Sequence, residues 1–157
     1  MVLYRVLLIV LATTMLLSSY SQSFLAEARL PKLGQKMPCV PDASKQYAIA
    51  QAQLAEGCEA IISDITYFFG TTDHKTIAYI STRDPKFRTP EGIHVGNTLI
   101  DVLSVNGGAP IEERGWAFYS ILRSGWRAEY PGLPGSGGDF GKAPEQSSKV
   151  VKLFIQR

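Results

Sequence analysis

The chain has 157 residues, a formal net charge of +2 and 19% charged residues. This near-neutral balance lacks the concentrated basic face of nucleic-acid-binding proteins, so no nucleic-acid partner is expected. The nearest basic cluster, Arg83, Lys86 and Arg88, is interleaved with acids and is interpreted as a solvated loop. Two histidines and two cysteines, without ligand-like spacing, predict neither a metal site nor a cofactor.

The first 28 residues have the pattern of an export signal. Arg5 precedes a short apolar run, and Ala26 and Ala28 fit the small-x-small pattern of a cleavage site. The run is shorter than the roughly twenty residues that span a bilayer, which favours a cleaved signal over an uncleaved anchor. We therefore predict a signal peptide at 1–28 and one domain at 29–157, periplasmic or secreted and not membrane-spanning after cleavage.

Two cysteines follow the predicted signal. In an exported protein, Cys39 and Cys58 are expected to form a structural disulfide rather than a redox pair, which favours Cys-x-x-Cys spacing. The segment 42–56 between them is rich in Ala, Gln and Leu and predicts a helix. The alternation of Tyr47 and Ile49 leaves a short strand open as the alternative.

β-Branched and aromatic residues predict the strands. The first hairpin is expected to comprise 61–69 and 76–81, joined by a polar turn. Residues 116–122 and 126–130 predict a second hairpin, and 150–155 a last strand that ties this end of the chain into the sheet.

The stretch 89–103 predicts a corner that leads from a strand into a capped helix. Gly92 and Gly96 supply backbone conformations that a side chain would penalise, and Thr98 and Asp101 have the spacing of a capping box. A phosphate-binding loop is the functional alternative, but no Gly-Lys-Ser/Thr follows. Together the elements predict an α+β fold, an antiparallel sheet of about five strands with two short helices packed on one face.

No catalytic set is recognisable, so an enzyme is not predicted. The Gly-x-Ser-x-Gly pattern is absent around Ser136. Glu112 and Glu113 are adjacent and would point apart on an extended chain, unlike the paired carboxylates of a glycosidase. A hydrolase working through Ser136 or Asp139 of the glycine-rich loop 131–144 remains the alternative.

Aromatic residues concentrate on the second predicted hairpin, and tryptophan and tyrosine are common at binding hot spots. Alternation places Trp116 and Phe118 on one face, and Ala117 and Tyr119 on the other. One face of this hairpin must belong to the core. The alternative to a binding surface is that the aromatic rings fill that core. The residues predicted to bind are Trp116, Tyr119, Trp126 and Tyr130.

Residues 60–108 resemble small exported bacterial domains. The resemblance is carried by Ile80-Ser81-Thr82, Phe87, the corner Thr89-x-x-Gly92-Ile93-x-Val95-Gly96-x-Thr98, and Val102. The chain is also similar to the outer-membrane-assembly lipoprotein and β-lactamase-inhibitor-protein class, in which a short helical unit packs on an antiparallel sheet. Asn97 stands where such domains often have Asp, and the lipid-attachment cysteine is missing, so no lipid anchor is implied.

The resemblance implies protein binding and supplies no catalytic residues. We therefore expect an exported, non-catalytic binding or inhibitor-type protein of the bacterial cell envelope. Its expected partner is another envelope or secreted protein. The alternatives are a small secreted hydrolase and a structural component of the envelope.

Overall fold

The computed structural model describes residues 30–105, 107–132 and 143–157, and Lys32–Arg157 form one compact unit. The predicted signal peptide at 1–28, Ser136 and Asp139 lie outside the described residues. Within the described ranges, no helix has the length and apolar character needed to cross a membrane.

The dominant element is one eight-stranded antiparallel sheet, so the predicted α+β fold with a five-stranded sheet and two helices is wrong. The strands in chain order are β1 (Tyr47–Ala50), β2 (Gln53–Ile62), β3 (Ile65–Thr71), β4 (Tyr79–Thr82), β5 (Ile111–Glu113), β6 (Ala117–Ile121), β7 (Arg127–Tyr130) and β8 (Lys152–Gln156). The order across the sheet is β1-β2-β3-β4-β8-β7-β6-β5. In the described part of the chain, α2 (Leu99–Ser104) is the single helix.

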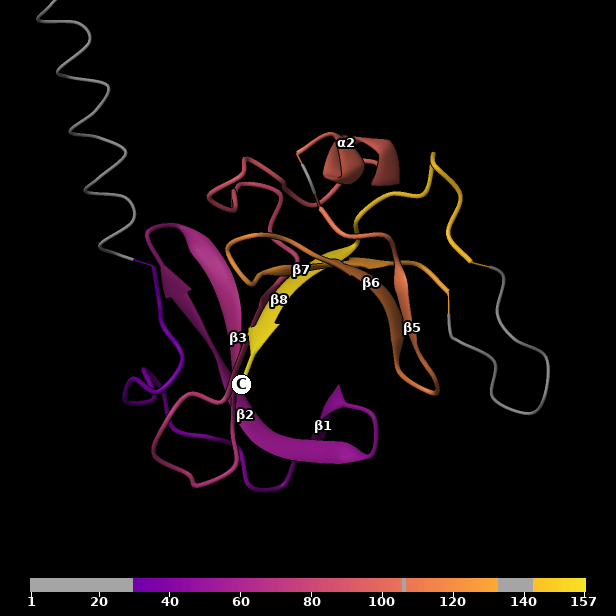
Figure 1. The fold of residues 1–157 in the computed structure, drawn as a ribbon. Coiled ribbons are helices and arrows are strands. Elements are labelled where there is room, and N and C mark those ends of the chain that lie inside the picture. Colours follow the sequence, from indigo (N-terminus) through magenta and orange to yellow (C-terminus); the bar gives the residue numbers. More distant parts are fainter. Residues whose placement is uncertain (1–29, 106, 133–142) are drawn as a thin grey trace, which may run out of the picture. The chain divides into compact units, whose positions relative to one another are not determined.

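The sheet curves strongly, and its two edge strands, β1 and β5, bend toward the same side (Figure 1). The Gln51 backbone N–H, in the turn after β1, donates to Glu113 Oε1 of β5 over 2.8 Å. This bond connects the two edges, although among the described strands no backbone ladder joins them. The result is a half-barrel with a concave face, whereas α2 lies over the opposite, convex face.

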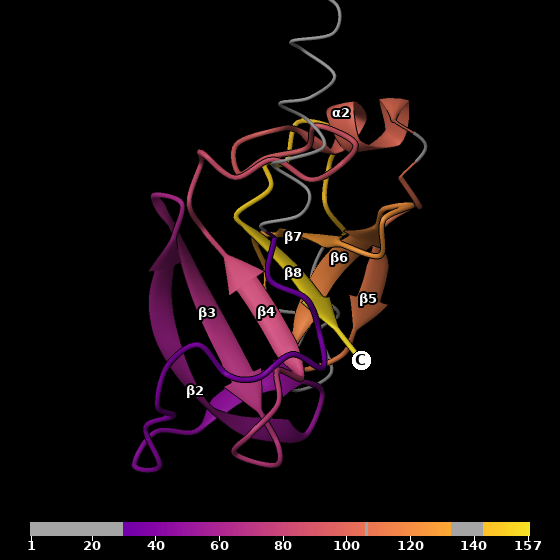
Figure 2. The ribbon, with the colours of Figure 1, turned by 90° about the vertical axis from the view of Figure 1, so that its left-hand side faces the viewer.

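The last strand occupies the middle of the sheet. β8 pairs with β4 on one side and with β7 on the other, as the side view also shows (Figure 2). The prediction that this end of the chain is tied into the sheet is therefore confirmed. β8 is also the element that joins the β1–β4 half of the sheet to the β5–β7 half.

Large apolar side chains fill the space between the convex face and the segments that cover it. Phe87, in the loop after β4, places its ring 5.8 Å from that of Tyr67 and 4.6 Å from that of Trp126, centroid to centroid. Leu99 and Val102 of α2 are buried as well. This layer buries the apolar surface that holds α2 and the 83–98 segment against the sheet.

The segment 42–56, predicted as a helix, instead forms β1, a turn at Ala52 with φ 54°, and the start of β2. Ile49 and Ala55 are 3% and 2% exposed, and both belong to the cluster on the concave face. Burial against a distant strand outweighs the modest helix propensity of Ala, Gln and Leu. The alternative of a short strand at Tyr47 is the correct one.

The strand predicted at 61–69 is divided by a tight turn. Ser63 and Asp64 have φ of 51° and 61°, and they connect β2 to β3. Two successive residues with positive φ are typical of two-residue hairpin turns, where Asn-Gly is the more recognisable sequence. The hairpin predicted to follow is confirmed, because β3 and β4 pair antiparallel.

The predicted corner and helix cap are confirmed. Gly92 and Gly96 have φ of 86° and 102°, which glycine adopts without the strain of a side chain. The Asp101 backbone N–H donates to Thr98 Oγ1, and the Asp101 carboxylate accepts from the Thr98 backbone N–H over 2.7 Å. That backbone bond is the main reason why the pKa of Asp101 lies below its ordinary value.

Replacing Thr98 by alanine is expected to lower the free energy of unfolding by about 1 kcal/mol, because the cap oxygen is lost. Urea denaturation of the two proteins measures the change. Thr72→Ala is the matched control, since Thr72 is exposed and makes no hydrogen bond within the described ranges. Equal losses in the two variants would contradict a stabilising role for the cap.

The predicted disulfide is confirmed: Cys39 and Cys58 are bonded. The bridge fastens the segment before β1 to β2. Two backbone bonds hold the same segment, from Met37 N to Lys75 O over 2.9 Å and from Asp42 N to Gly57 O over 3.0 Å. The segment is thus fixed to the sheet without forming a strand of its own there.

Candidate ligand-binding groove

The four aromatic residues predicted to form one binding surface lie on opposite sides of the sheet. Trp126 and Tyr130 are 4% and 1% exposed and belong to the convex core. The Tyr130 hydroxyl donates to the buried Ser120 Oγ over 3.2 Å. These two rings are therefore covered by the protein itself and are not available to a partner in this structure.

Trp116 and Tyr119 lie on the concave side instead. Their ring centroids are 4.9 Å and 5.5 Å from that of Phe154 in β8. The predicted alternation fails at Trp116 because this residue belongs to the turn between β5 and β6, where the period of two does not apply. Phe118, expected on the same face as Trp116, is buried and points to the convex side with Tyr130, its partner in the ladder.

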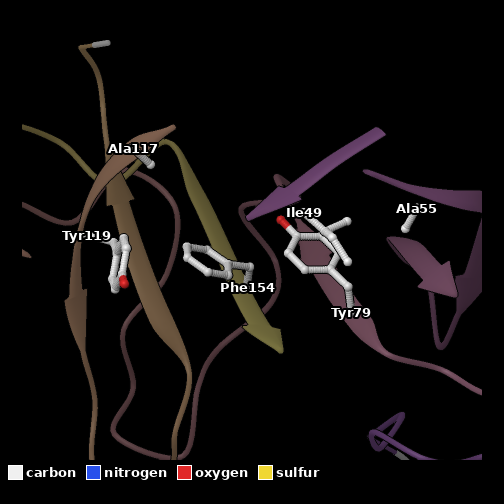
Figure 3. Close-up of a cluster of buried hydrophobic side chains, with 6 residues drawn as sticks. All are labelled: Ile49, Ala55, Tyr79, Ala117, Tyr119 and Phe154. Carbon is white, nitrogen blue, oxygen red and sulfur yellow. The ribbon is translucent and has the colours of Figure 1, made fainter. Parts of the chain in front are cut away.

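A cluster of buried apolar side chains lies on the concave face (Figure 3). Its members are Ile49, Ala55, Tyr79, Ala117, Tyr119 and Phe154. They come from β1, β2, β4, β6 and β8, so the cluster holds the two halves of the curved sheet together.

Two cations lie against the rings of this face. The Arg127 guanidinium carbon is 5.1 Å from the ring centroid of Tyr119, and Lys152 Nζ is 5.4 Å from that of Trp116. Lys152 Nζ also lies 2.5 Å from Glu129 Oε2, and the two side chains are only 15% and 14% exposed. Because Glu129 Oε2 has no hydrogen-bond partner among the described residues, this contact is an ion pair without hydrogen-bond geometry.

Beside the cluster, the concave face opens into a groove of about 630 Å³. One wall is aromatic: the ring centroids of Tyr47 and Phe68 are 4.5 Å apart, and those of Phe68 and Tyr79 are 6.0 Å apart. The cations that line it are Arg83, Lys86 and Lys152. Apolar walls with a few charged groups, at volumes of about 300–1,000 Å³, are typical of small-ligand sites.

Gly57 positions the Phe68 ring in this wall. A Cβ at this position of β2 would lie 2.3 Å from Phe68 Cζ and 2.6 Å from the Phe69 carbonyl oxygen. The absence of a side chain therefore lets the ring lie against the β2 backbone. Because the preceding segment 42–56 was predicted as a helix, this packing role of Gly57 was not predicted.

The loop 83–86 forms the rim of the groove. The Asp84 carboxylate accepts from the backbone N–H groups of Lys86 and Thr66, over 2.9 Å and 3.2 Å. The bond from Lys86 is the main cause that lowers the pKa of Asp84. The carboxylate thus shapes this loop, which was predicted only to be solvated.

The comparisons with known proteins assign the chain to no family. No protein-family model and no curated protein matches the chain. Among solved structures, the chain is similar to the uncharacterized protein yfeY from Escherichia coli, with 16% identity and a TM-score of 0.48. The similarity covers 72% of this chain and 79% of that chain. So distant a likeness carries no argument, and the candidate site is argued from the residues of this chain alone.

Proposed function

We propose that the protein is an exported, non-catalytic binding protein that holds a ligand in the groove of its concave face. The observation that supports this function is the groove itself, with an aromatic wall of Tyr47, Phe68 and Tyr79 and cations beside it. The disulfide between Cys39 and Cys58 fits an oxidising compartment outside the cytoplasm.

This proposal keeps the binding function expected from the sequence and changes the surface. Trp126 and Tyr130 are buried, whereas Tyr47 and Phe68 are partly exposed in the groove. Binding to another envelope protein, as the resemblance to the lipoprotein and inhibitor class implies, remains a prediction. A groove of this volume suits a small ligand better than a broad protein surface.

The Phe68→Ala variant tests the groove directly. The purified protein is titrated with N-phenyl-1-naphthylamine, an uncharged aromatic probe whose fluorescence rises in apolar surroundings. We expect the variant to bind about tenfold more weakly, because the ring at the centre of the aromatic wall is lost.

Leu54→Ala is the matched control for this titration. Leu54 is an apolar residue of the same strand pair, 60% exposed, and it does not line the groove. Circular dichroism establishes that both variants are folded. If Phe68→Ala binds the probe as tightly as the unmodified protein, the groove is not the binding site.

A further inference from the structure

We infer that the ligand of the groove is an amphipathic organic anion, with a flat apolar body on the aromatic wall and an acidic group held by Arg83 and Lys152. The inference rests on the proposed function and adds to it the chemical class of the ligand. The evidence for it is how far the side chains of Arg83 and Lys152 are engaged by acceptors of the protein itself.

Arg83 is the first of these cations. It directly follows β4, which supplies Tyr79 and Ser81 to the groove, and its side chain is exposed. Within the described ranges, its guanidinium makes no hydrogen bond and no ion pair. Burial raises the pKa of Tyr79, and the Arg83 charge opposes that rise, so the guanidinium lies within electrostatic reach of the aromatic wall. A fork of N–H donors without a protein acceptor suits a carboxylate or sulfonate.

Lys152 is the second. Its ammonium is mostly buried beside Glu129 and the rings of Trp116 and Phe154. Its contact with Glu129 lacks hydrogen-bond geometry, and among the described residues the ammonium donates no hydrogen bond. An ammonium has three donors, so this one can still bind an anion, in surroundings where water screens the interaction less than at the surface.

Glu129 already pairs with Lys152 but does not line the groove, and the acids that do line it, Asp84 and Glu59, do not cancel this preference. Both oxygens of Asp84 accept backbone N–H groups, so that charge serves the loop. Glu59 is exposed on β2, and no ion pair joins it to Arg83 in the part of the chain that the structure describes. Arg83 and Lys86 at the rim would therefore repel a cationic ligand and attract an anionic one.

The aromatic wall specifies the rest of the ligand. Tyr47, Phe68 and Tyr79 form a row of rings at centroid distances of 4.5 Å and 6.0 Å. Such rings bury a flat aromatic or alicyclic body well, and offset or edge contacts with them add to its burial. The ligand class is thus an aryl or alicyclic carboxylate or sulfonate.

A pair of matched probes tests this class. The probe 8-anilino-1-naphthalenesulfonate differs from N-phenyl-1-naphthylamine by its sulfonate, so the ratio of their affinities reports the contribution of the charge. For the purified protein we expect the anionic probe to bind about tenfold more tightly at low salt, a preference that added salt reduces. Arg83→Gln is expected to remove most of this preference by weakening the binding of the anionic probe.

Arg123→Gln is the control, because Arg123 is an exposed arginine in the turn after β6 and does not line the groove. This variant should keep the full preference. Equal affinities for the two probes, or an unchanged preference in Arg83→Gln, overturn the anionic ligand class. If Phe68→Ala still weakens the binding of both probes, the groove remains the binding site. If neither probe depends on Phe68, the proposed function and the inference fail together.

Discussion

The Trp126→Ala variant is expected to lower the free energy of unfolding by about 3–5 kcal/mol, the range found for large aromatic side chains removed from cores. Trp126 is 4% exposed and its ring lies 4.6 Å from that of Phe87, centroid to centroid. Truncation leaves a cavity between the convex face and the 83–98 segment. Urea denaturation followed by far-ultraviolet circular dichroism measures the loss without depending on tryptophan fluorescence.

Trp116→Ala provides the comparison, since it makes the same substitution at a ring that is only partly buried. We expect a clearly smaller loss there, because part of that ring already faces water. A change of less than about 0.5 kcal/mol for Trp126→Ala would contradict its place in the core. Trp126, which the sequence predicted to be a binding residue, would then be free to contact a partner.

Removing the disulfide is the second change with a large expected effect. The double variant Cys39→Ala, Cys58→Ala is expected to lose about 3 kcal/mol of unfolding free energy, because a closed loop no longer restricts the unfolded chain. The comparison is urea denaturation of the oxidised protein and of the double variant. An unchanged midpoint would contradict a stabilising bridge.

Ligand binding should survive this change under conditions where the variant is folded. Cys58 leaves β2 on the face opposite to Glu59, which lines the groove, because successive residues of a strand point to opposite faces. Titration with N-phenyl-1-naphthylamine measures this. A large loss of affinity in the folded variant would mean that the bridge shapes the groove as well as stabilising the fold.

Local sequence signals predicted the features that depend on a few neighbouring residues. The capping box at Thr98 and Asp101 follows from the chemistry of two side chains three positions apart. The positive φ angles at Gly92 and Gly96 follow from the backbone freedom of glycine. The disulfide followed from the number of cysteines and the expected compartment.

Features that depend on contacts across the sheet were not predictable in the same way. The segment 42–56 favours a helix locally, but Ile49 and Tyr47 gain more by packing against residues of β3, β4 and β8. β5 has three residues, too few to show an alternation. For these two reasons, and because the turn at Ser63 and Asp64 divides the predicted 61–69 strand, the number of strands was underestimated.

Predicting the groove from the sequence would have required the strand order and register of the whole sheet. Tyr47, Phe68, Arg83 and Lys152 come from four distant parts of the chain, and they meet because β8 lies beside β4. Composition alone placed the most aromatic stretch at the second hairpin. The structure divides the rings of that hairpin between two faces, so abundance of aromatic residues did not locate the site.

The central place of β8 has a consequence for how the chain acquires its structure. Among the described residues, strands β1 to β4 pair with their neighbours in sequence, and so do β5 to β7, and β8 joins these two sets. β8 follows both sets in the chain and pairs with an edge of each, with β4 on one side and with β7 on the other. Until β8 is in place, the facing edges of β4 and β7 remain unpaired, so the half-barrel and its groove form only when β8 pairs with both.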